Sequence, residues 1–354
     1  MHNTNNHRGL RVVGSSHNLA VSLAKRIIGQ PAAMTGIAPY VQLHQAGLAP
    51  EGRPVGVFLL LGPSGTGKTR TVEALAEVLH GSDKNVLRVD CGELQMEHEV
   101  AKLIGAPPGY LGHRETQPLL SQAKLNAVSS DRSKLSLVLF DEIEKAAPSL
   151  TRLLLGILDK ASLRLGDNTH VNFEQTLIFL TSNLGARDML NYLKPSFGFN
   201  AAAGDERSVE EIGSKLQSIG LAAVKKRFAP EFVNRVDAVI TYQPLSQQTL
   251  DGILELQLLE IQKHIHKRLA SNAFSLQLTK ASRAYLLARG TSEEFGAREL
   301  KRTLHRELVH PLGAMVANDR IPPRCTLRID AAKGADRLRF RIVPPGRDEL
   351  LPAA

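Results

Sequence analysis

Eight residues, GPSGTGKT from Gly62 to Thr69, fit the spacing G-x-x-x-x-G-K-[ST] of a phosphate-binding loop. The apolar run GVFLLL precedes them, and the helical pattern TRTVEALAEVLHG follows. Glycines let the backbone wrap a polyphosphate with its N–H groups pointing inward, and a helix N-terminus favours the anion. The predicted nucleotide-binding residues are Gly62, Pro63, Ser64, Gly65, Thr66, Gly67, Lys68 and Thr69. Lys68 is expected on the β- and γ-phosphates, and Thr69 on Mg²⁺.

A second apolar strand, LSLVLFDE, ends in two carboxylates. Asp141 at its end is suited to hold Mg²⁺ through the water shell of the metal, and Glu142 is suited to act as general base on the attacking water. Together with the phosphate-binding loop, this strand predicts hydrolysis of a nucleoside triphosphate, with ATP and Mg²⁺ as the ligands.

A third polar strand end, TSN, follows the apolar run QTLIFL. In a sheet wound so that this strand lies between the strands that lead to Lys68 and Asp141, Asn183 would orient the water or touch the γ-phosphate. The other interpretation is a helix N-cap. The spacing alone leaves both open.

The order of the predicted elements favours an α/β fold. Continuous apolar strands alternate with helices as far as Tyr242, which indicates a parallel sheet covered by helices. Residues 245–318 are dominated by helical patterns, and TLRIDAAKGADRLRFRIVPP predicts a terminal β-hairpin. The expected organisation is a flexible polar tail at 1–18, a large domain at 19–243, a smaller mainly helical domain at 244–346 and a tail at 347–354.

The overall composition narrows the class of protein. The chain has 354 residues and a formal net charge of +9, but no dense Lys/Arg run with interleaved aromatics, so a solvated surface is favoured over nucleic-acid or acidic-membrane binding. Cys91 and Cys325 lack metal-ligand spacing and indicate free thiols in a reducing compartment. The start has no apolar signal region, and no run is long enough for a membrane span. We therefore expect a soluble, cytoplasmic protein.

At this point the sequence resembles the AAA+ ATPases, and within them the Clp chaperone and unfoldase group. It is most similar to the second ATPase module of the two-ring members, from RIIGQ at Arg26 to GARELKR at 296–302. FDEIEKA resembles the group's second ATP motif, TSNLGA its sensor-1 segment, FAPEFVNRVD its arginine-finger segment and GAREL its sensor-2 segment. The resemblance implies the AAA+ P-loop fold, with a small helical domain as a lid.

The resemblance also implies roles for single residues. Ile27, Ile28, Gly29 and Gln30 would line the adenine pocket, and Asn183 would be sensor 1. Arg235 would be the finger that reaches the ATP of a neighbouring subunit, and Arg298 would contact the γ-phosphate from the small domain. A guanidinium at the γ-phosphate lowers the barrier because negative charge spreads over its oxygens during transfer.

The resemblance extends to a loop rich in glycine and proline. In the unfoldases, a Gly-Tyr-Val-Gly loop faces a central pore and grips polypeptide, and Gly109, Tyr110, Leu111 and Gly112 match that form. The alternative is a turn whose Tyr110 packs against its own domain. The next residues, His113 to Thr116, depart from the family pattern, which bears on substrate preference. The segment KASLRLGDNTHVNF is similar to the family's secondary pore loop, with a degraded acidic-Gly pattern.

A hydrophobic-Gly-hydrophobic tripeptide occurs between the sensor-1 and arginine-finger segments. Phe197, Gly198 and Phe199 resemble the motif with which members of the group dock on the Clp peptidase, and apolar anchors suit insertion into clefts of a partner. The alternative is a loop tethered to its own domain by its aromatics.

The predicted function is that of an ATP-hydrolysing, ring-forming protein unfoldase, as the resemblance implies, with a homo-hexamer as the expected assembly. The chain holds one ATPase module, so a single-ring machine or a fragment is expected, and the starting Met with a polar tail favours a naturally short chain. Two alternatives remain, a nucleic-acid remodeller of the same superfamily, suggested by the net charge of +9, and a scaffold whose assembly is timed by nucleotide.

Overall fold

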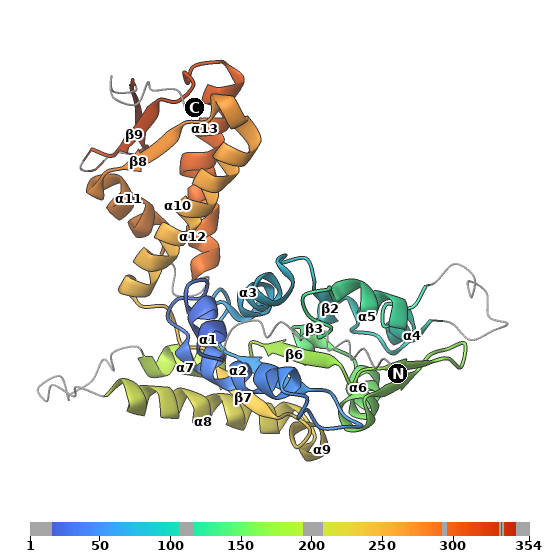
Figure 1. The fold of residues 1–354 in the computed structure, drawn as a ribbon. Coiled ribbons are helices and arrows are strands. Elements are labelled where there is room, and N and C mark those ends of the chain that lie inside the picture. The colour runs from blue at the N-terminus through green and yellow to red at the C-terminus, as the bar shows by residue number, and fades with distance from the viewer. Residues whose placement is uncertain are drawn as a thin grey trace, which may run out of the picture. The chain divides into compact units, whose positions relative to one another are not determined.

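The computed structural model describes residues 16–105, 117–193, 208–291, 296–332, 334 and 336–344. The chain divides into two compact units, the first coloured from blue to yellow and the second, apart from Pro63–Thr66, from orange to red in Figure 1. The first unit comprises the chain up to Gly62 and Gly67–Gln243. The second comprises Pro63–Thr66 and the chain from Pro244 onward.

A five-stranded parallel sheet forms the centre of the first unit. Its strands are β1 (Gly56–Leu61), β2 (Leu87–Asp90), β3 (Ser136–Asp141), β6 (Thr176–Ser182) and β7 (Ala238–Thr241), in the order β2-β3-β6-β1-β7. β6, which ends next to Asn183, therefore lies between β1, which leads to Lys68, and β3, which ends at Asp141. This strand order is the one under which Asn183 was expected to reach the water or the γ-phosphate. The apolar runs of the sequence analysis correspond to β1, β3 and β6, and the α/β class agrees with it, whereas β7 was not predicted.

Helices cover this sheet (Figure 1). They are α1 (Ser16–Ala24), α2 (Pro31–Gln45), α3 (Lys68–His80), α4 (Ala101–Ile104), α5 (Gln122–Val128), α6 (Pro148–Lys160), α7 (Ala186–Leu193), α8 (Val209–Arg227) and α9 (Pro230–Val233), with 3₁₀ turns at Cys91–Glu93, Glu97–Val100 and Ile143–Lys145. The segment similar to a secondary pore loop forms a hairpin of β4 (Ser162–Arg164) and β5 (His170–Asn172). The first helix begins at Ser16, within the last three residues of the predicted tail 1–18. Leu19 and Leu23 of this helix are buried in the core, which fixes it to the domain.

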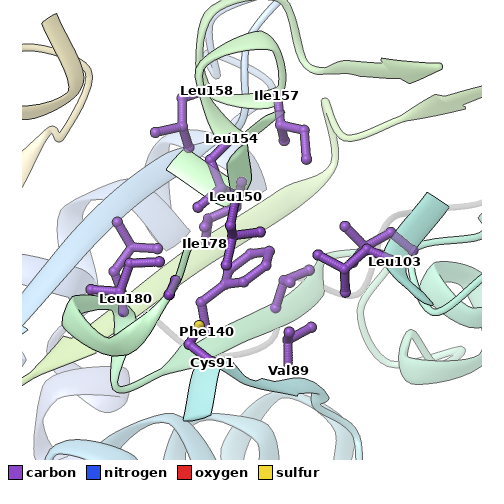
Figure 2. Close-up of a cluster of buried hydrophobic side chains, with 14 of the residues drawn as sticks. Val89, Cys91, Leu103, Phe140, Leu150, Leu154, Ile157, Leu158, Ile178 and Leu180 are labelled. Atoms are coloured by element: carbon purple, nitrogen blue, oxygen red, sulfur yellow. The ribbon is translucent and has the colours of Figure 1, made fainter. Parts of the chain in front are cut away.

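Alternate residues of the strands supply two separate cores. Val57, Leu59 and Leu61 of β1 face one cluster, and Phe58 and Leu60 face the other. Every residue of β1 is buried because both faces of the sheet are covered. Figure 2 shows the first cluster, in which Phe140 of β3 and Ile178 of β6 pack with Leu150, Leu154 and Ile157 of α6. Continuous apolar strands are the sequence counterpart of this arrangement.

The second unit is mainly helical. It contains α10 (Gln247–Leu269), a 3₁₀ turn at Ala270–Asn272, α11 (Lys280–Gly290), α12 (Ala297–Leu304), a π-helical turn at His305–Val309 and α13 (His310–Ala317). Its sheet has the order β10-β9-β8, formed by β8 (Ser275–Leu278), β9 (Thr326–Asp330) and β10 (Arg339–Val343). The antiparallel pair of β9 and β10 is the predicted hairpin. The sequence analysis missed β8, which pairs with β9 in parallel.

The described helices contain no segment long and apolar enough to span a membrane. Both cysteines are free and buried. Burial raises the pKa of the Cys91 thiol, and the carboxylates of Asp141, Asp90, Glu144 and Glu142 raise it further. A thiol held in its neutral form is a packing group rather than a nucleophile.

Candidate functional site

The phosphate-binding loop connects β1 to α3 and depends on glycine at its first position. Gly62 has a φ of 143°, and a Cβ placed there would lie 2.6 Å from the carbonyl oxygen of Tyr242. Tyr242 is fully buried, and its hydroxyl donates to Thr71 Oγ1 of α3 at 2.7 Å. The close approach of two chain segments therefore requires glycine at position 62.

The side chain of Lys68 is buried at the start of α3, with 8% of its surface exposed. Its Nζ donates to the carbonyl oxygen of Gly62 at 2.6 Å and to Asn183 Oδ1 at 2.9 Å. Both acceptors are neutral. A buried ammonium at the start of α3, beside the glycine-rich loop, suits an anionic ligand, because charge-assisted hydrogen bonds to an anion are stronger than bonds to neutral oxygens.

Asp141 stands at the end of β3, where its carboxylate is close to Thr69 of α3. Thr69 Oγ1 donates to Asp141 Oδ1 at 3.5 Å, and the Thr181 hydroxyl and the Arg88 guanidinium also donate to this carboxylate. Mg²⁺ prefers oxygen ligands and commonly takes one or two from protein with the rest from phosphates and water. Thr69 and Asp141 therefore fit Mg²⁺. Among the described residues, no group of three or more His, Cys, Asp or Glu could hold a metal.

Glu142 follows Asp141 in a left-handed conformation, with a φ of 59°, and its N–H donates to Thr181 Oγ1 at 3.0 Å. Glu142 Oε2 accepts a hydrogen bond from Lys145 Nζ at 2.6 Å, and Oε1 accepts one from Asn183 Nδ2 at 3.5 Å. The bond with Glu142 raises the pKa of Lys145. The carboxylate is thus positioned by its backbone and held by two neighbours.

Asn183 therefore lies between the lysine and the glutamate, with its amide oxygen towards Lys68 and its amide nitrogen towards Glu142. Its backbone carbonyl accepts from Ala186 N at the start of α7, at 3.1 Å. The side chain faces the phosphate-binding loop, which favours the site interpretation over the N-cap. Sequence reasoning missed Thr181, Arg88 and Lys145, although Thr181 and Lys145 stand inside motifs it had recognised.

The remaining predicted residues of the first unit lie in different surroundings. Arg235 follows α9, has 42% of its side chain exposed, and forms an ion pair with Asp159 of α6 at 2.5 Å. Ile27 is buried in the core, while Ile28 is half-buried. Gln30 is buried and exchanges two hydrogen bonds with the backbone of Gln243, at 2.8 and 3.1 Å.

Arg298 belongs to α12 in the second unit, which also contains Pro63–Thr66. Within this unit, Arg298 Nη1 donates to Ser64 Oγ at 3.0 Å, and Ala297 N donates to Gly65 O at 3.1 Å. The predicted pore-loop residues Gly109, Tyr110, Leu111 and Gly112 lie outside the described residues, as do Phe197, Gly198 and Phe199.

Two family models match the chain, one in each predicted domain. The first, an AAA domain of the Cdc48 subfamily, matches residues 53–239. The second, the C-terminal D2-small domain of ClpB protein, matches residues 245–329.

Curated relatives match almost the whole chain. Chaperone protein ClpB of Mesorhizobium japonicum is 36% identical over 322 residues, which are 91% of this chain and 34% of the relative. Heat shock protein 100 of Trypanosoma brucei brucei is 33% identical over 325 residues, 92% of this chain and 35% of the relative. The chain thus spans about a third of the length of these relatives.

Solved structures of Hsp104 share the fold. A closed-state reconstruction of Hsp104 with ATPγS and FITC casein has a TM-score of 0.75 and 27% identity, over 94% of this chain and 53% of that one. The extended conformation of the Saccharomyces cerevisiae Hsp104–casein complex has a TM-score of 0.76 and 26% identity, over 92% and 52%.

Proposed function

Because the chain belongs to the AAA+ ATPases, in the group of ClpB and Hsp104 chaperones, we propose that it hydrolyses ATP and uses the energy to unfold proteins. The observation that supports hydrolysis best is the position of the Asn183 amide between Lys68 and Glu142. Protein as the substrate is suggested by the casein in the two Hsp104 structures.

In this proposal, the phosphate-binding loop cradles the polyphosphate of MgATP. The Lys68 ammonium exchanges neutral oxygens for phosphate oxygens, while Thr69 and Asp141 supply oxygen ligands to Mg²⁺, which would neutralise charge on the phosphates. Ile28 and the backbone of Ile27 and Gly29 would contact the adenine, since the Ile27 side chain is already used in the core.

Glu142 is the proposed general base. It must take the proton of the attacking water, and its Oε2 atom now accepts from Lys145. Lys145 is about half exposed, so this ion pair is weak enough to open when water is positioned at the carboxylate. Asn183 would hold both the water and the γ-phosphate, and Arg298 would contact the γ-phosphate.

We further propose that the active form is a homo-hexameric ring in which Arg235 completes the ATP site of the neighbouring subunit. The half-exposed side chain and its ion pair with Asp159 are consistent with a residue that exchanges partners on assembly. An arginine supplied in trans makes hydrolysis depend on assembly through a head-to-tail interface. The free, buried cysteines are consistent with a cytoplasmic setting.

The unfolding activity is proposed to depend on the loop that carries Tyr110. The test is ATP-dependent unfolding of a stable, tagged protein by the wild-type chain and by Tyr110→Ala. Loss of unfolding with ATPase retained is the expected result, whereas unfolding that survives the substitution rejects the pore role. Stimulation of the ATPase by DNA instead of protein would favour the nucleic-acid alternative.

Phe197, Gly198 and Phe199 are proposed as a docking segment for a Clp-type peptidase. The test is size-exclusion chromatography of the Glu142→Gln chain with ATP, with and without such a peptidase. Co-elution that is lost in Phe197→Ala supports docking. Absence of co-elution under conditions in which the ring is formed rejects it and leaves the ATPase proposal intact.

A further inference from the structure

The turn that follows Asp141 and Glu142 is tied to two other elements through Glu144. Glu144 Oε1 accepts the backbone N–H of Asn183 at 3.0 Å. Its carbonyl oxygen accepts two bonds from one guanidinium, from Arg227 Nε at 3.2 Å and from Nη2 at 2.9 Å. Glu144 thus links the nucleotide end of β6 to the end of α8.

Arg227 is the last residue of α8, and its contacts continue towards Arg235. Its guanidinium carbon lies 5.7 Å from the centroid of the Phe228 ring. This ring stacks on that of Phe232 at 5.1 Å with an interplanar angle of 30°. Phe232 is buried, and its carbonyl oxygen accepts from Arg235 N at 3.2 Å. Movement of the Glu144 turn would therefore be passed to the backbone that carries Arg235.

A cation at a helix C-terminus has an ordinary structural function, because it compensates the helix dipole. The geometry of Arg227 goes beyond this function. Its hydrogen bonds go to the carbonyls of Glu144 and Ala146, in the turn after β3, at 2.9 to 3.4 Å. Charge-assisted hydrogen bonds from the planar guanidinium hold the end of α8 and the turn after β3 in a fixed orientation. A neighbouring lysine has no planar group with several donors and would not do this.

We propose that Arg227 is a positioning residue that couples the ATP site of its own subunit to the placement of Arg235, and through Arg235 to hydrolysis in the neighbouring subunit. The inference rests on the proposed function, since it requires a ring with Arg235 in trans. When γ-phosphate engages Lys68 and Asn183, the Asn183 N–H moves Glu144, and Arg227 carries this movement to α9.

Mixed rings test the inference, because they separate effects on a subunit's own site from effects on its neighbour. Wild-type chain is mixed with increasing amounts of Glu142→Gln chain, whose own ATP site is expected to contribute almost no hydrolysis. The same series is made with Glu142→Gln/Arg227→Met and, as the matched control, with Glu142→Gln/Lys226→Met. Lys226 is exposed and lies on the same turn, so both substitutions remove one charge from the end of α8.

Turnover per wild-type subunit is expected to be about tenfold lower with the Glu142→Gln/Arg227→Met partner than with the Glu142→Gln or the Glu142→Gln/Lys226→Met partner. A change of about tenfold is what the loss of one charge-assisted hydrogen bond typically produces. Equal inhibition by all three partners overturns the inference. A loss of ATP binding by Arg227→Met alone also overturns it, because the residue would then act on its own site.

Two further measurements keep the test decisive. Arg235→Ala is assayed first, and full turnover by this variant rejects the proposed trans site itself rather than the role of Arg227. Thermal unfolding compares Arg227→Met with Lys226→Met. If Arg227→Met unfolds at a clearly lower temperature, Arg227→Lys replaces it in the mixed rings, since it keeps the charge but not the planar fork. If turnover per wild-type subunit is the same with the Glu142→Gln/Arg227→Lys partner as with the Glu142→Gln partner, the inference is overturned.

Discussion

Lys68 Nζ donates a hydrogen bond to Asn183 Oδ1 at 2.9 Å, which joins the start of α3 to the residue after β6, beyond the ends of the adjacent strands β1 and β6. Replacement of the lysine by methionine keeps an unbranched side chain, shorter by about one atom, and removes the charge. Since hydrogen bonds to charged groups contribute about 1.5–3 kcal/mol, Lys68→Met is expected to weaken ATP binding by roughly 10- to 100-fold. Titration with a fluorescent ATP analogue measures the loss.

A second variant separates the charge of Lys68 from its hydrogen bond to Asn183. Asn183→Ala removes the same hydrogen bond but leaves the ammonium, so ATP should still bind while turnover falls. If Asn183→Ala and Lys68→Met weaken binding equally, the lysine does not act through its charge.

Glu142→Gln changes one atom of the proposed base and preserves the shape of the side chain. General-base catalysis contributes about 10²- to 10⁴-fold, so turnover should fall within this range while ATP remains bound. Single-turnover hydrolysis together with size-exclusion chromatography measures both properties. Lys145→Met is the matched comparison, because it removes the group that holds Glu142 Oε2 and should leave hydrolysis within a few-fold of wild type. Full turnover by Glu142→Gln would assign the base to another residue.

Much of this site could be predicted from sequence because its chemistry depends on residues at the ends of continuous apolar strands. Lys68, Asp141 and Asn183 each follow such a run, and parallel strands bring these ends to one edge. The contact of Arg88 with Asp141 was not predictable in the same way. Buried and exposed residues alternate along β2, and Arg88 is one of the exposed residues. Its contact with Asp141 depends on the register in which β2 pairs with β3, which the sequence does not reveal.

The sequence analysis missed β7 and β8 for a related reason. β7 has only four residues, AVIT, and three of them are half-buried, so it lacks the continuous burial and length of β1 or β6. β8, SLQL, alternates exposed and half-buried residues and pairs in parallel with a strand about fifty positions later. Short segments of this kind become strands through tertiary pairing rather than intrinsic preference.

Gly62→Ala is expected to destabilise the first unit. The new Cβ would lie 2.6 Å from the Tyr242 carbonyl oxygen, and a φ of 143° is strained for alanine. The expected cost is about 2 kcal/mol or more, and the Tyr242 segment must shift. Thermal unfolding and ATP binding should both report the change.

Gly47→Ala is the control for this prediction. Its φ of 69° is also positive, but no atom lies within 4 Å of the added Cβ. A Gly62→Ala chain as stable as Gly47→Ala would show that the contact with Tyr242 yields without cost.

Stability should fall in mild acid because burial lowers the pKa of His80 and of His44. Above a pH of about 6.5, both histidines are neutral in the folded and unfolded chains, so they add no pH dependence. Below it, the unfolded chain takes up protons before the folded chain does, and the free energy of unfolding decreases until the lowered pKa is reached. Thermal unfolding between pH 7.5 and about 5 measures this loss.

His80→Gln should reduce the acid-dependent part of this loss, since glutamine does not titrate and can still bond to Ser130 Oγ, which His80 Nδ1 contacts at 2.9 Å. The exposed His98 provides the comparison variant His98→Gln. Identical acid profiles for the two variants would contradict the assignment to His80.

The position of β1 in the sheet has a consequence for the synthesis of the protein. Its two hydrogen-bonded neighbours are β6 and β7, so a fully apolar strand that is complete at Leu61 finds its last partner only when Thr241 has been made. Pairing between segments so distant in sequence is slow, and an unpaired apolar edge invites association with other chains. On the ribosome, the nascent first unit therefore carries β1 as an apolar strand without its full set of partners through most of its translation. A protein proposed to unfold other proteins would itself be exposed to misfolding until Thr241 has been synthesised.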